Sequence, residues 1–178
     1  MIQEKHKYKN NIIKDKIQSH KINKWFNKKK WSFYDYQIKA LQAINQNKDI
    51  LITSPTGSGK TLAGLLPTIL ESDKFKKNNL YTIFISPLKS LSYDIERNLL
   101  APINECDLNL TISVRTGDTT SYTKTKQIEK PPNILVTTPE SFALLMSYKN
   151  AEEYFSNLKY LIIDELHNII HSKRGDLL

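Results

Sequence analysis

Residues 54–61, Ser-Pro-Thr-Gly-Ser-Gly-Lys-Thr, combine the groups that a phosphate-binding loop uses. An apolar run at residues 50–53 precedes them, and a helix-forming run begins at Thr61. In this order the turn exposes successive backbone N–H groups to phosphate oxygens, and the helix adds the positive end of its dipole. Lys60 would reach the β- and γ-phosphates, and the Thr61 hydroxyl would hold Mg²⁺. The stretch therefore predicts a nucleoside triphosphate site.

The strict form of this loop begins with glycine, whereas position 54 is serine, and Gly-Lys-Thr also occurs in ordinary turns. The loop alone leaves a plain turn open as an alternative. A second catalytic element is needed to decide between the two. The nucleotide-binding residues predicted in the loop are Ser54, Thr56, Gly57, Ser58, Gly59, Lys60 and Thr61.

The apolar run at residues 160–164 ends in Asp164, and Glu165 and His167 follow it. In a parallel sheet, these side chains emerge at the same edge as the loop at residues 54–61. Asp164 would hold Mg²⁺, and Glu165 would orient and deprotonate the attacking water. His167 would link the nucleotide site to later elements. An isolated Asp-Glu pair is also a common helix N-cap, but its combination with the loop favours nucleotide hydrolysis.

Alternation of apolar runs and helical patterns indicates the elements that must position these residues. Because the runs are short and rich in β-branched residues, they predict an α/β fold with a mainly parallel sheet and helices on both faces. A weaker pattern predicts a short helix near residues 10–26. Strands are expected at residues 50–53, 80–86, 110–115, 134–138 and 160–164, and helices at residues 36–47, 60–71, 89–100, 119–129 and 139–148.

The net charge of +8 is concentrated at the N-terminus. Residues 1–30 contain ten Lys and two acidic residues, whereas residues 31–178 balance sixteen basic against sixteen acidic side chains. A basic segment of this kind either binds nucleic-acid phosphates or is simply solvated. The single cysteine, Cys106, excludes an internal disulfide, and no apolar stretch is long enough to span a membrane. Without an apolar signal region, the sequence predicts a cytoplasmic protein with no membrane partner.

Together, the loop and the Asp-Glu-Leu-His run resemble motifs I and II of superfamily 2 helicases of the DExH subgroup. The stretch between them strengthens this resemblance, which covers roughly residues 25–178. Further motifs in matching order are Tyr36-Gln37 of the adenine-reading element, Ser86-Pro87-Leu88-Lys89-Ser90-Leu91 of motif Ia, Arg115-Thr116-Gly117-Asp118-Thr119 and Thr137-Thr138-Pro139-Glu140-Ser141 of motif Ib. With His171-Ser172-Lys173-Arg174-Gly175, these stretches look most like the large helicase-related (Lhr-like) type, in its ligase-associated DNA-repair branch.

The resemblance implies a RecA-like P-loop NTPase domain that uses ATP and Mg²⁺ and acts on nucleic acid, DNA in preference to RNA. Gln37 would then read the adenine edge, and Lys60, Asp164, Glu165 and His167 would be the catalytic residues. Phosphodiester contacts without sequence reading would suit such a motor. By resemblance they come from Lys89, Arg115, Thr116, Gly117, Thr138 and Pro139.

Two family elements are absent from this sequence. No Ser-Ala-Thr of motif III follows Glu165, and no arginine-finger motif is present. In the family topology the motif III strand lies between the strands at residues 50–53 and 160–164. The resemblance thus predicts a fragment: a basic segment at residues 1–30 and a partial ATP-binding domain at residues 31–178. Hydrolysis coupled to translocation is not expected of it unless a second chain supplies the missing RecA-like domain.

Two other readings of the sequence stay open. The chain is alternatively part of an RNA-directed DExH helicase, because superfamily motifs do not separate DNA from RNA. It is alternatively a nucleotide-binding remnant without catalysis. A small-molecule kinase that uses the same loop is disfavoured, because no lid or substrate base accompanies the Asp-Glu-Leu-His run.

Overall fold

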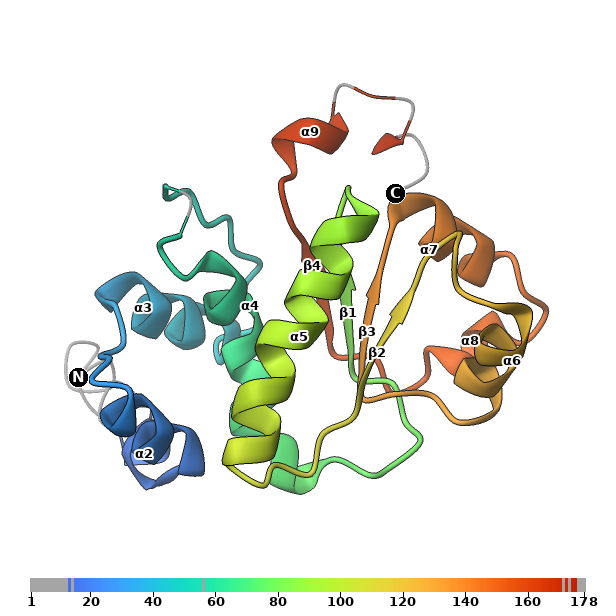
Figure 1. Cartoon of the computed structure of the whole chain (residues 1–178). Helices are drawn as coiled ribbons and strands as arrows, with labels where there is room; N and C mark the ends of the chain where they lie inside the picture. The colour runs from blue at the N-terminus through green and yellow to red at the C-terminus, as the bar shows by residue number, and fades with distance from the viewer. Residues whose placement is uncertain (1–12, 14, 56, 171, 173, 176–178) are drawn as a thin grey trace. The chain divides into compact units, whose positions relative to one another are not determined.

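The computed structural model describes residues 13, 15–55, 57–170, 172, 174 and 175 (Figure 1). They form two compact units, Met1–Glu71 and Ser72–Leu178, each of which is described by itself. The predicted boundary between residues 30 and 31 stays a prediction; residues 1–12 and 14 of the basic segment lie outside the described residues.

The first unit is helical. It contains α2 (Lys21–Lys28), α3 (Asp35–Ile44) and α4 (Lys60–Leu70), and residues 15–19 are helical as well. The single helix expected near residues 10–26 is interrupted at His20, whose backbone is extended and whose Nδ1 accepts a hydrogen bond from the Ile22 N–H at 3.1 Å. This N-cap starts a new helix, whose apolar side buries Ile22, Trp25 and Phe26.

The strand expected at residues 50–53 is wrong: this segment has no regular secondary structure and carries no ladder pairing. Leu51 is 75% exposed and Ile50 is 37% exposed. None of the strands in the described part of the chain pairs with it. An apolar run becomes a strand only when a neighbouring strand takes up its backbone N–H and C=O groups.

The second unit is built on a parallel four-stranded sheet. Its strands β1 (Thr82–Ile85), β2 (Ile112–Arg115), β3 (Ile134–Thr137) and β4 (Tyr160–Ile163) lie in the order β2-β3-β1-β4. All three pairings are parallel and in register over four residues. The predicted α/β class is confirmed, and so are the other four predicted strands.

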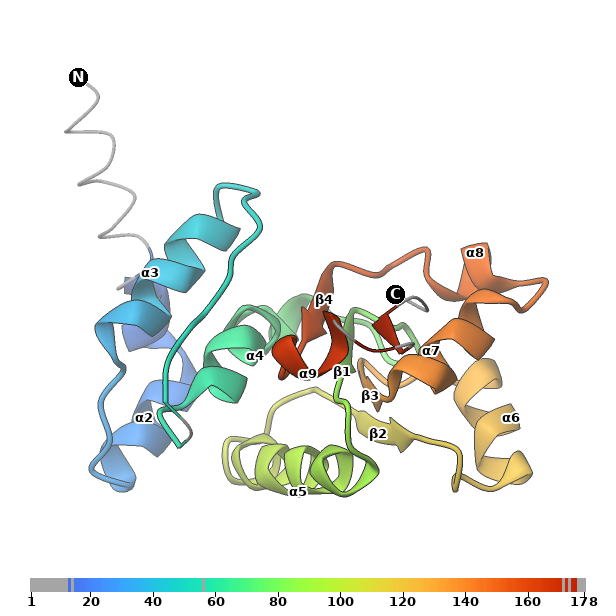
Figure 2. The ribbon, with the colours of Figure 1, turned by 90° about the horizontal axis from the view of Figure 1, so that it is seen from above.

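Helices cover both faces of this sheet, as expected. Figure 2 shows α5 (Lys89–Glu105) on one face and α7 (Pro139–Met146) and α8 (Ala151–Tyr154) on the other. The unit also contains α6 (Ser121–Glu129), α9 (His167–Ile170) and the short 3₁₀ helix η1 (Ser72–Lys74). Helix α5 runs further than predicted, and α8 was not predicted at all.

The core of the second unit follows the two-residue alternation of its strands. Ile83, Ile85 and Leu135 are fully buried and pack with Leu145 of α7. Phe84, which alternates with them along β1, is buried as well. Because the four strands are parallel, they all end at the same edge of the sheet, and each connection from a strand to the following helix begins there.

The two edges of the sheet differ. At the β2 edge, the Gln127 side chain of α6 donates to Ser113 Oγ at 2.6 Å and to the Val114 carbonyl at 2.9 Å, which protects that edge. At the β4 edge, Leu161 is 51% exposed and Ile163 is 36% exposed. The further strand that family topology places beside β4 stays a prediction. No helix among the described residues has both the length and the apolar character that a membrane span requires.

Candidate functional site

The loop before α4 turns at two glycines with positive φ angles. Gly57 and Gly59 have φ angles of 76° and 89°, in the left-handed region that glycine adopts without strain. A Cβ atom at Gly59 would lie 2.9 Å from Gln37 Nε2, so glycine is needed there for space as well. Helix α4 begins directly afterwards, with neither a side-chain cap nor an acidic residue in its first turn. The N-terminus of a helix without such groups suits an anion.

Lys60 closes this loop on itself. Its ammonium donates to the carbonyl oxygens of Ser54 at 2.7 Å and Pro55 at 2.9 Å, while the hydroxyls of Ser54 and Ser58 share a hydrogen bond of 2.7 Å. Phosphate oxygens are stronger acceptors than carbonyls, so an incoming phosphate can replace them at the ammonium. Thr61 is half-buried in the first turn of α4, and Thr56 lies outside the described residues.

The start of α3 is fastened to the same loop. The Gln37 side chain is 1% exposed; its Oε1 accepts from the Tyr34 N–H at 3.0 Å and its Nε2 donates to the Gly59 carbonyl at 3.2 Å. The Tyr36 hydroxyl donates to the Ser58 carbonyl at 2.5 Å. Both arms of the Gln37 amide are thus engaged inside the protein, and reading adenine would require them to exchange partners. Its adenine role stays a prediction.

In the second unit, β4 ends in the turn that carries the predicted carboxylates. The Asp164 N–H donates to the Ile85 carbonyl at 2.9 Å, and its Oδ1 accepts from the Glu165 N–H at 3.0 Å. Glu165 has a φ of 49°, and a left-handed non-glycine residue at a turn marks a strained position of the kind found in functional sites. Its Oε2 lies 3.4 Å from His167 Nε2. The turn therefore presents two carboxylates at the carboxyl edge of the sheet.

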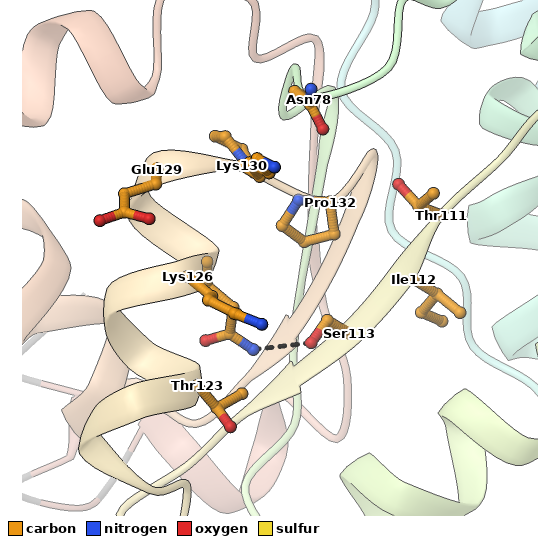
Figure 3. A pocket seen from close by; sticks show the side chains of 11 residues that line it. Asn78, Thr111, Ile112, Ser113, Thr123, Lys126, Glu129, Lys130 and Pro132 are labelled. Carbon is orange, nitrogen blue, oxygen red and sulfur yellow. Dashed lines mark hydrogen bonds between the residues drawn. The ribbon is translucent and has the colours of Figure 1, made fainter.

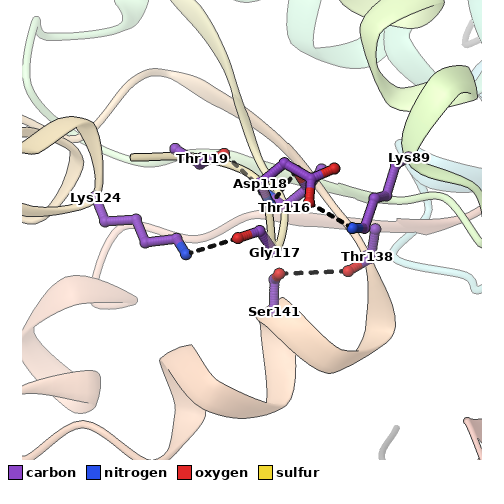
Figure 4. Close-up of polar contacts among 8 residues, drawn as sticks. All are labelled: Lys89, Thr116, Gly117, Asp118, Thr119, Lys124, Thr138 and Ser141. Atoms are coloured by element: carbon purple, nitrogen blue, oxygen red, sulfur yellow. Dashed lines mark hydrogen bonds and ion pairs between the residues drawn. The ribbon is translucent and has the colours of Figure 1, made fainter. Parts of the chain in front are cut away.

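The carboxyl ends of β1, β2 and β3 bring three further predicted segments together (Figure 4). Lys89, at the start of α5, forms an ion pair of 2.6 Å with Asp118 in the turn after β2. The Gly117 carbonyl accepts from Lys124 Nζ at 3.3 Å, and a Cβ at Gly117 would lie 3.5 Å from Lys89 Nζ. Lys89, Gly117 and Asp118 are all exposed, so this cluster offers cations and backbone groups to a ligand.

The predicted threonines act as supports of this surface. Thr116 is buried; its N–H donates to Thr119 Oγ1 at 2.9 Å, and its hydroxyl accepts from the Asp118 N–H at 3.3 Å. Thr138 is buried too, and its hydroxyl donates to Ser141 Oγ at 3.3 Å at the start of α7. Pro139 fills the first position of that helix, where no N–H is needed. Both threonine side chains are thus engaged inside the protein, and Gly117 and Asp118 are the exposed residues of the turn after β2.

Arg115 lies inside the unit, not on this surface. Its guanidinium is 2% exposed and donates to the Lys124 carbonyl at 3.0 Å and to Tyr148 Oη at 2.8 Å. It also lies 5.7 Å from the centre of the Tyr148 ring. These contacts connect β2 to α6 and to the segment that follows α7. They engage the guanidinium inside the unit, away from the predicted phosphate contact.

Four charged residues near these segments escaped the sequence prediction. Asp118 follows Gly117 directly, Lys124 Nζ donates to the Gly117 carbonyl, and Glu140 follows Pro139 directly. Glu140 is paired with Arg174, whose Nε and Nη2 donate to its two carboxylate oxygens. Position within a recognised motif was the only signal for Asp118 and Glu140, since acidic residues are not expected beside phosphates.

A separate cleft of about 390 Å³ lies between α6 and the first residues of β2 (Figure 3). Ser113, Lys126 and Lys130 are among the residues that line it. None of the predicted site residues lines this cleft, which lies by the beginning of β2 and not at the edge where the strands end. It is not the candidate site.

Comparison with known proteins decides the family. The profile of the DEAD/DEAH box helicases matches residues 34–178. The chain belongs to the DEAD/DEAH box helicase family. It is 41% identical over 165 residues to the ATP-dependent helicase Lhr-Core of Saccharolobus solfataricus, which covers 86% of this chain and 19% of that protein. It is 36% identical over 151 residues to the Lhr helicase/uracil glycosylase of Escherichia coli, which covers 73% of this chain and 10% of that protein.

Solved helicase structures agree with this family. The Mycobacterium smegmatis helicase Lhr bound to ssDNA and AMP-PNP superposes with a TM-score of 0.80 at 33% identity, over 89% of this chain and 22% of that chain. The DUF1998 helicase MrfA bound to DNA and AMPPNP gives a TM-score of 0.70 at 29% identity, over 77% of this chain and 19% of that one. The RecA-like architecture and the Lhr-like resemblance are confirmed, and the ligase-associated branch stays a prediction.

The chain spans about a fifth or less of the length of these curated relatives. The match to the family profile begins at residue 34 of this chain and includes all the motifs named above from that residue onwards. Because the relatives are named ATP-dependent helicases, family membership implies that ATP is the nucleotide used.

Proposed function

We propose that this chain is the ATP-binding and nucleic-acid-binding part of an ATP-dependent DNA helicase of the Lhr type, in which ATP hydrolysis drives strand translocation in the whole protein. The observation that carries the proposal is that one family match, over residues 34–178, contains both the left-handed glycine loop before α4 and the Asp164-Glu165 turn after β4. The first supplies a phosphate cradle and the second supplies carboxylates for hydrolysis.

The nucleotide role is divided among named groups. The loop and the N-terminus of α4 bind the phosphates, with Ser54, Ser58 and the two glycines shaping the turn, and Lys60 exchanges its carbonyl partners for the β- and γ-phosphates. The Thr61 hydroxyl and the Asp164 carboxylate are each hard oxygen donors of the kind that Mg²⁺ prefers. Bound Mg²⁺ neutralises charge that develops on the phosphates.

Two residues near Asp164 act on the water and on coupling. Glu165 orients the attacking water and accepts its proton, and the turn that holds its backbone left-handed aims its carboxylate. His167 pairs with Glu165 Oε2 at 3.4 Å and orients that carboxylate. Gln37 holds the start of α3 to the loop, so that adenine binding there would be sensed by the phosphate cradle.

The nucleic-acid role belongs to the carboxyl ends of β1, β2 and β3. Lys89, the Gly117 turn that Thr116 supports, and the start of α7 at Thr138 and Pro139 would take phosphodiester oxygens. Cations, backbone N–H groups and helix N-termini bind phosphates without reading bases, as a translocating motor requires. The relatives that bind ssDNA or DNA in their structures favour DNA over RNA for this chain.

Two further proposals concern the setting. As the resemblance to superfamily 2 helicases implies, translocation would use a second RecA-like domain, from elsewhere in a longer protein or from a second chain. A DNA-acting motor with a lone cysteine suits the cytoplasm.

The proposal is tested by binding of a fluorescent ATP analogue with Mg²⁺ and by ATP turnover with and without ssDNA. Lys60→Ala removes a charge-assisted contact worth about 1.5–3 kcal/mol, so affinity should fall roughly 10- to 100-fold. Lys48→Ala, which changes an exposed lysine of the same unit, is the matched control and should bind as the wild type does. Equal affinity in both variants would contradict the nucleotide site. Tighter binding of ssRNA than of ssDNA would favour the RNA-directed alternative.

A further inference from the structure

A carboxylate stands where the proposed interface takes phosphates. Glu140 is the second residue of α7, directly after Thr138 and Pro139, and its side chain is 48% exposed. The N-terminus of a helix attracts anions, so this carboxylate and a nucleic-acid phosphate compete for the same field. Left alone, Glu140 would repel the phosphate that the start of α7 is proposed to bind.

Arg174 neutralises this charge through two hydrogen bonds to the Glu140 carboxylate. Its Nε donates to Oε1 of Glu140, and its Nη2 donates to Oε2 at 3.2 Å. Two parallel donors on two carboxylate oxygens form the fork that arginine provides and lysine does not. These bonds are the main cause that lowers the pKa of Glu140, ahead of its contact with the Thr138 side chain, so the carboxylate stays ionised and paired.

The local backbone places Arg174 for this contact. The Ser172 hydroxyl donates to the Ile169 carbonyl at 2.8 Å, and the Gly175 N–H donates to the Ser172 carbonyl at 2.8 Å. A Cβ at Gly175 would lie 2.5 Å from the Ile169 carbonyl oxygen, so only glycine allows the chain to fold back this closely onto the end of α9. The tight turn after α9 thus carries Arg174 to α7.

We propose that Arg174 is a positioning residue of the nucleic-acid interface, which neutralises and holds the Glu140 carboxylate so that the start of α7 accepts a phosphate. The inference rests on the nucleic-acid role proposed above. It also gives a physical tie between two motifs, because Arg174 follows the Asp164-Glu165 turn in the chain and Glu140 belongs to the segment after β3. Arg174 itself makes no contact with the nucleic acid in this scheme.

The test measures ssDNA binding to the whole chain by fluorescence anisotropy at low salt. Arg174→Ala should weaken binding roughly two- to fivefold, the range expected from an exposed charge pair. Glu140→Gln, which removes the charge that needs neutralising, should bind at least as tightly as the wild type. The double variant should return to within about twofold of Glu140→Gln. All differences should shrink at high salt.

The matched control is Arg97→Ala, which removes another exposed arginine paired with a carboxylate, Asp94 at 2.7 Å on α5. It changes the net charge equally, and its effect should be smaller than that of Arg174→Ala. Thermal melting checks that each variant is folded, and Arg174→Gln replaces Arg174→Ala if the alanine variant is not.

Three results would overturn the inference: unchanged binding by Arg174→Ala, a loss by Arg97→Ala of the same size, or a double variant that stays as weak as Arg174→Ala. The last outcome would mean that Arg174 contacts the strand directly. Failure of the proposed interface is distinguishable from these. In that case the wild type does not bind ssDNA, or Lys89→Ala binds as well as the wild type, and the inference falls with it.

Discussion

The two glycines of the loop before α4 should differ sharply when each is replaced by alanine. Both have positive φ angles, 76° at Gly57 and 89° at Gly59. A Cβ at Gly57 meets nothing within 4 Å, whereas a Cβ at Gly59 lies 2.9 Å from Gln37 Nε2. The same substitution therefore tests backbone strain alone at one position and strain plus displacement of a buried amide at the other.

The magnitudes follow from these contacts. A left-handed alanine costs about 1–2 kcal/mol, which is the whole expected loss for Gly57→Ala. Gly59→Ala bears that cost and also pushes aside the Gln37 amide, which is 1% exposed and bonded to Tyr34 N and the Gly59 carbonyl. A buried polar group left without its partner costs about 1–3 kcal/mol, so Gly59→Ala should lower the free energy of unfolding by about 2–5 kcal/mol in total.

Urea unfolding followed by tryptophan fluorescence measures this difference in stability, and it reports on the compact unit that contains the loop. The chain has two tryptophans, Trp25 and Trp31, and both belong to the unit that contains the loop. The midpoint should shift much further for Gly59→Ala than for Gly57→Ala, at an unchanged slope. Binding of the ATP analogue should weaken in both variants, because both distort the phosphate cradle.

A double variant isolates the contact with the amide. In Gln37→Ala/Gly59→Ala the added Cβ no longer meets the Gln37 side chain. The loss of stability should therefore be smaller than the sum of the two single losses by about 2 kcal/mol. Equal destabilisation by Gly57→Ala and Gly59→Ala, or strict additivity in the double variant, would refute the reasoning that Gln37 braces the loop.

Three further outcomes are expected in the second unit. Asp118→Asn should tighten ssDNA binding several-fold at low salt, because it frees Lys89 from its 2.6 Å ion pair. Burial raises the pKa of Tyr154 to about 12 from 10.0, so the free energy of unfolding should fall as pH rises from 10 towards 12, and Tyr154→Phe should abolish this loss in alkaline urea titrations. Arg115→Gln should cost about 2–3 kcal/mol in melting experiments, since it breaks the buried bond to Tyr148.

Tyr154→Phe also has an expected sign at neutral pH. The Tyr154 hydroxyl is buried and finds no hydrogen-bond partner among the described residues. Removing an unsatisfied buried donor should leave stability unchanged or raise it by about 1 kcal/mol. A clear destabilisation of Tyr154→Phe at pH 7 would show that the hydroxyl has a partner, such as water.

Local pattern was enough to predict most of the second unit and the glycine turn before α4. Short β-branched runs gave four strands within two residues of their bounds, and turn residues between them placed Lys89, Gly117 and Pro139 at strand ends. These features depend on neighbours in the chain, so periodicity and motif spacing record them. The parallel order then follows, since strand and helix alternate.

Pairing in space decided what local pattern could not. Residues 50–53 have strand-like composition but remain unpaired, because ladder bonds come from another segment. Arg115 sits in a motif yet turns inwards to Tyr148, thirty-three residues later in the chain. Gln37 also lies in a motif, yet its amide forms hydrogen bonds inside the protein, with the Tyr34 N–H and the Gly59 carbonyl.

The sequence by itself therefore determined which chemical groups this protein carries and at which strand ends they stand, because both are local properties. Only the tertiary structure decided which of these groups are free to meet a ligand. Ion pairs and hydrogen bonds form between residues that are far apart in the chain, as between Asp118 and Lys89 and between Arg174 and Glu140. Those pairings depend on how the parallel strands bring separate turns to one edge, and no spacing in the chain records them.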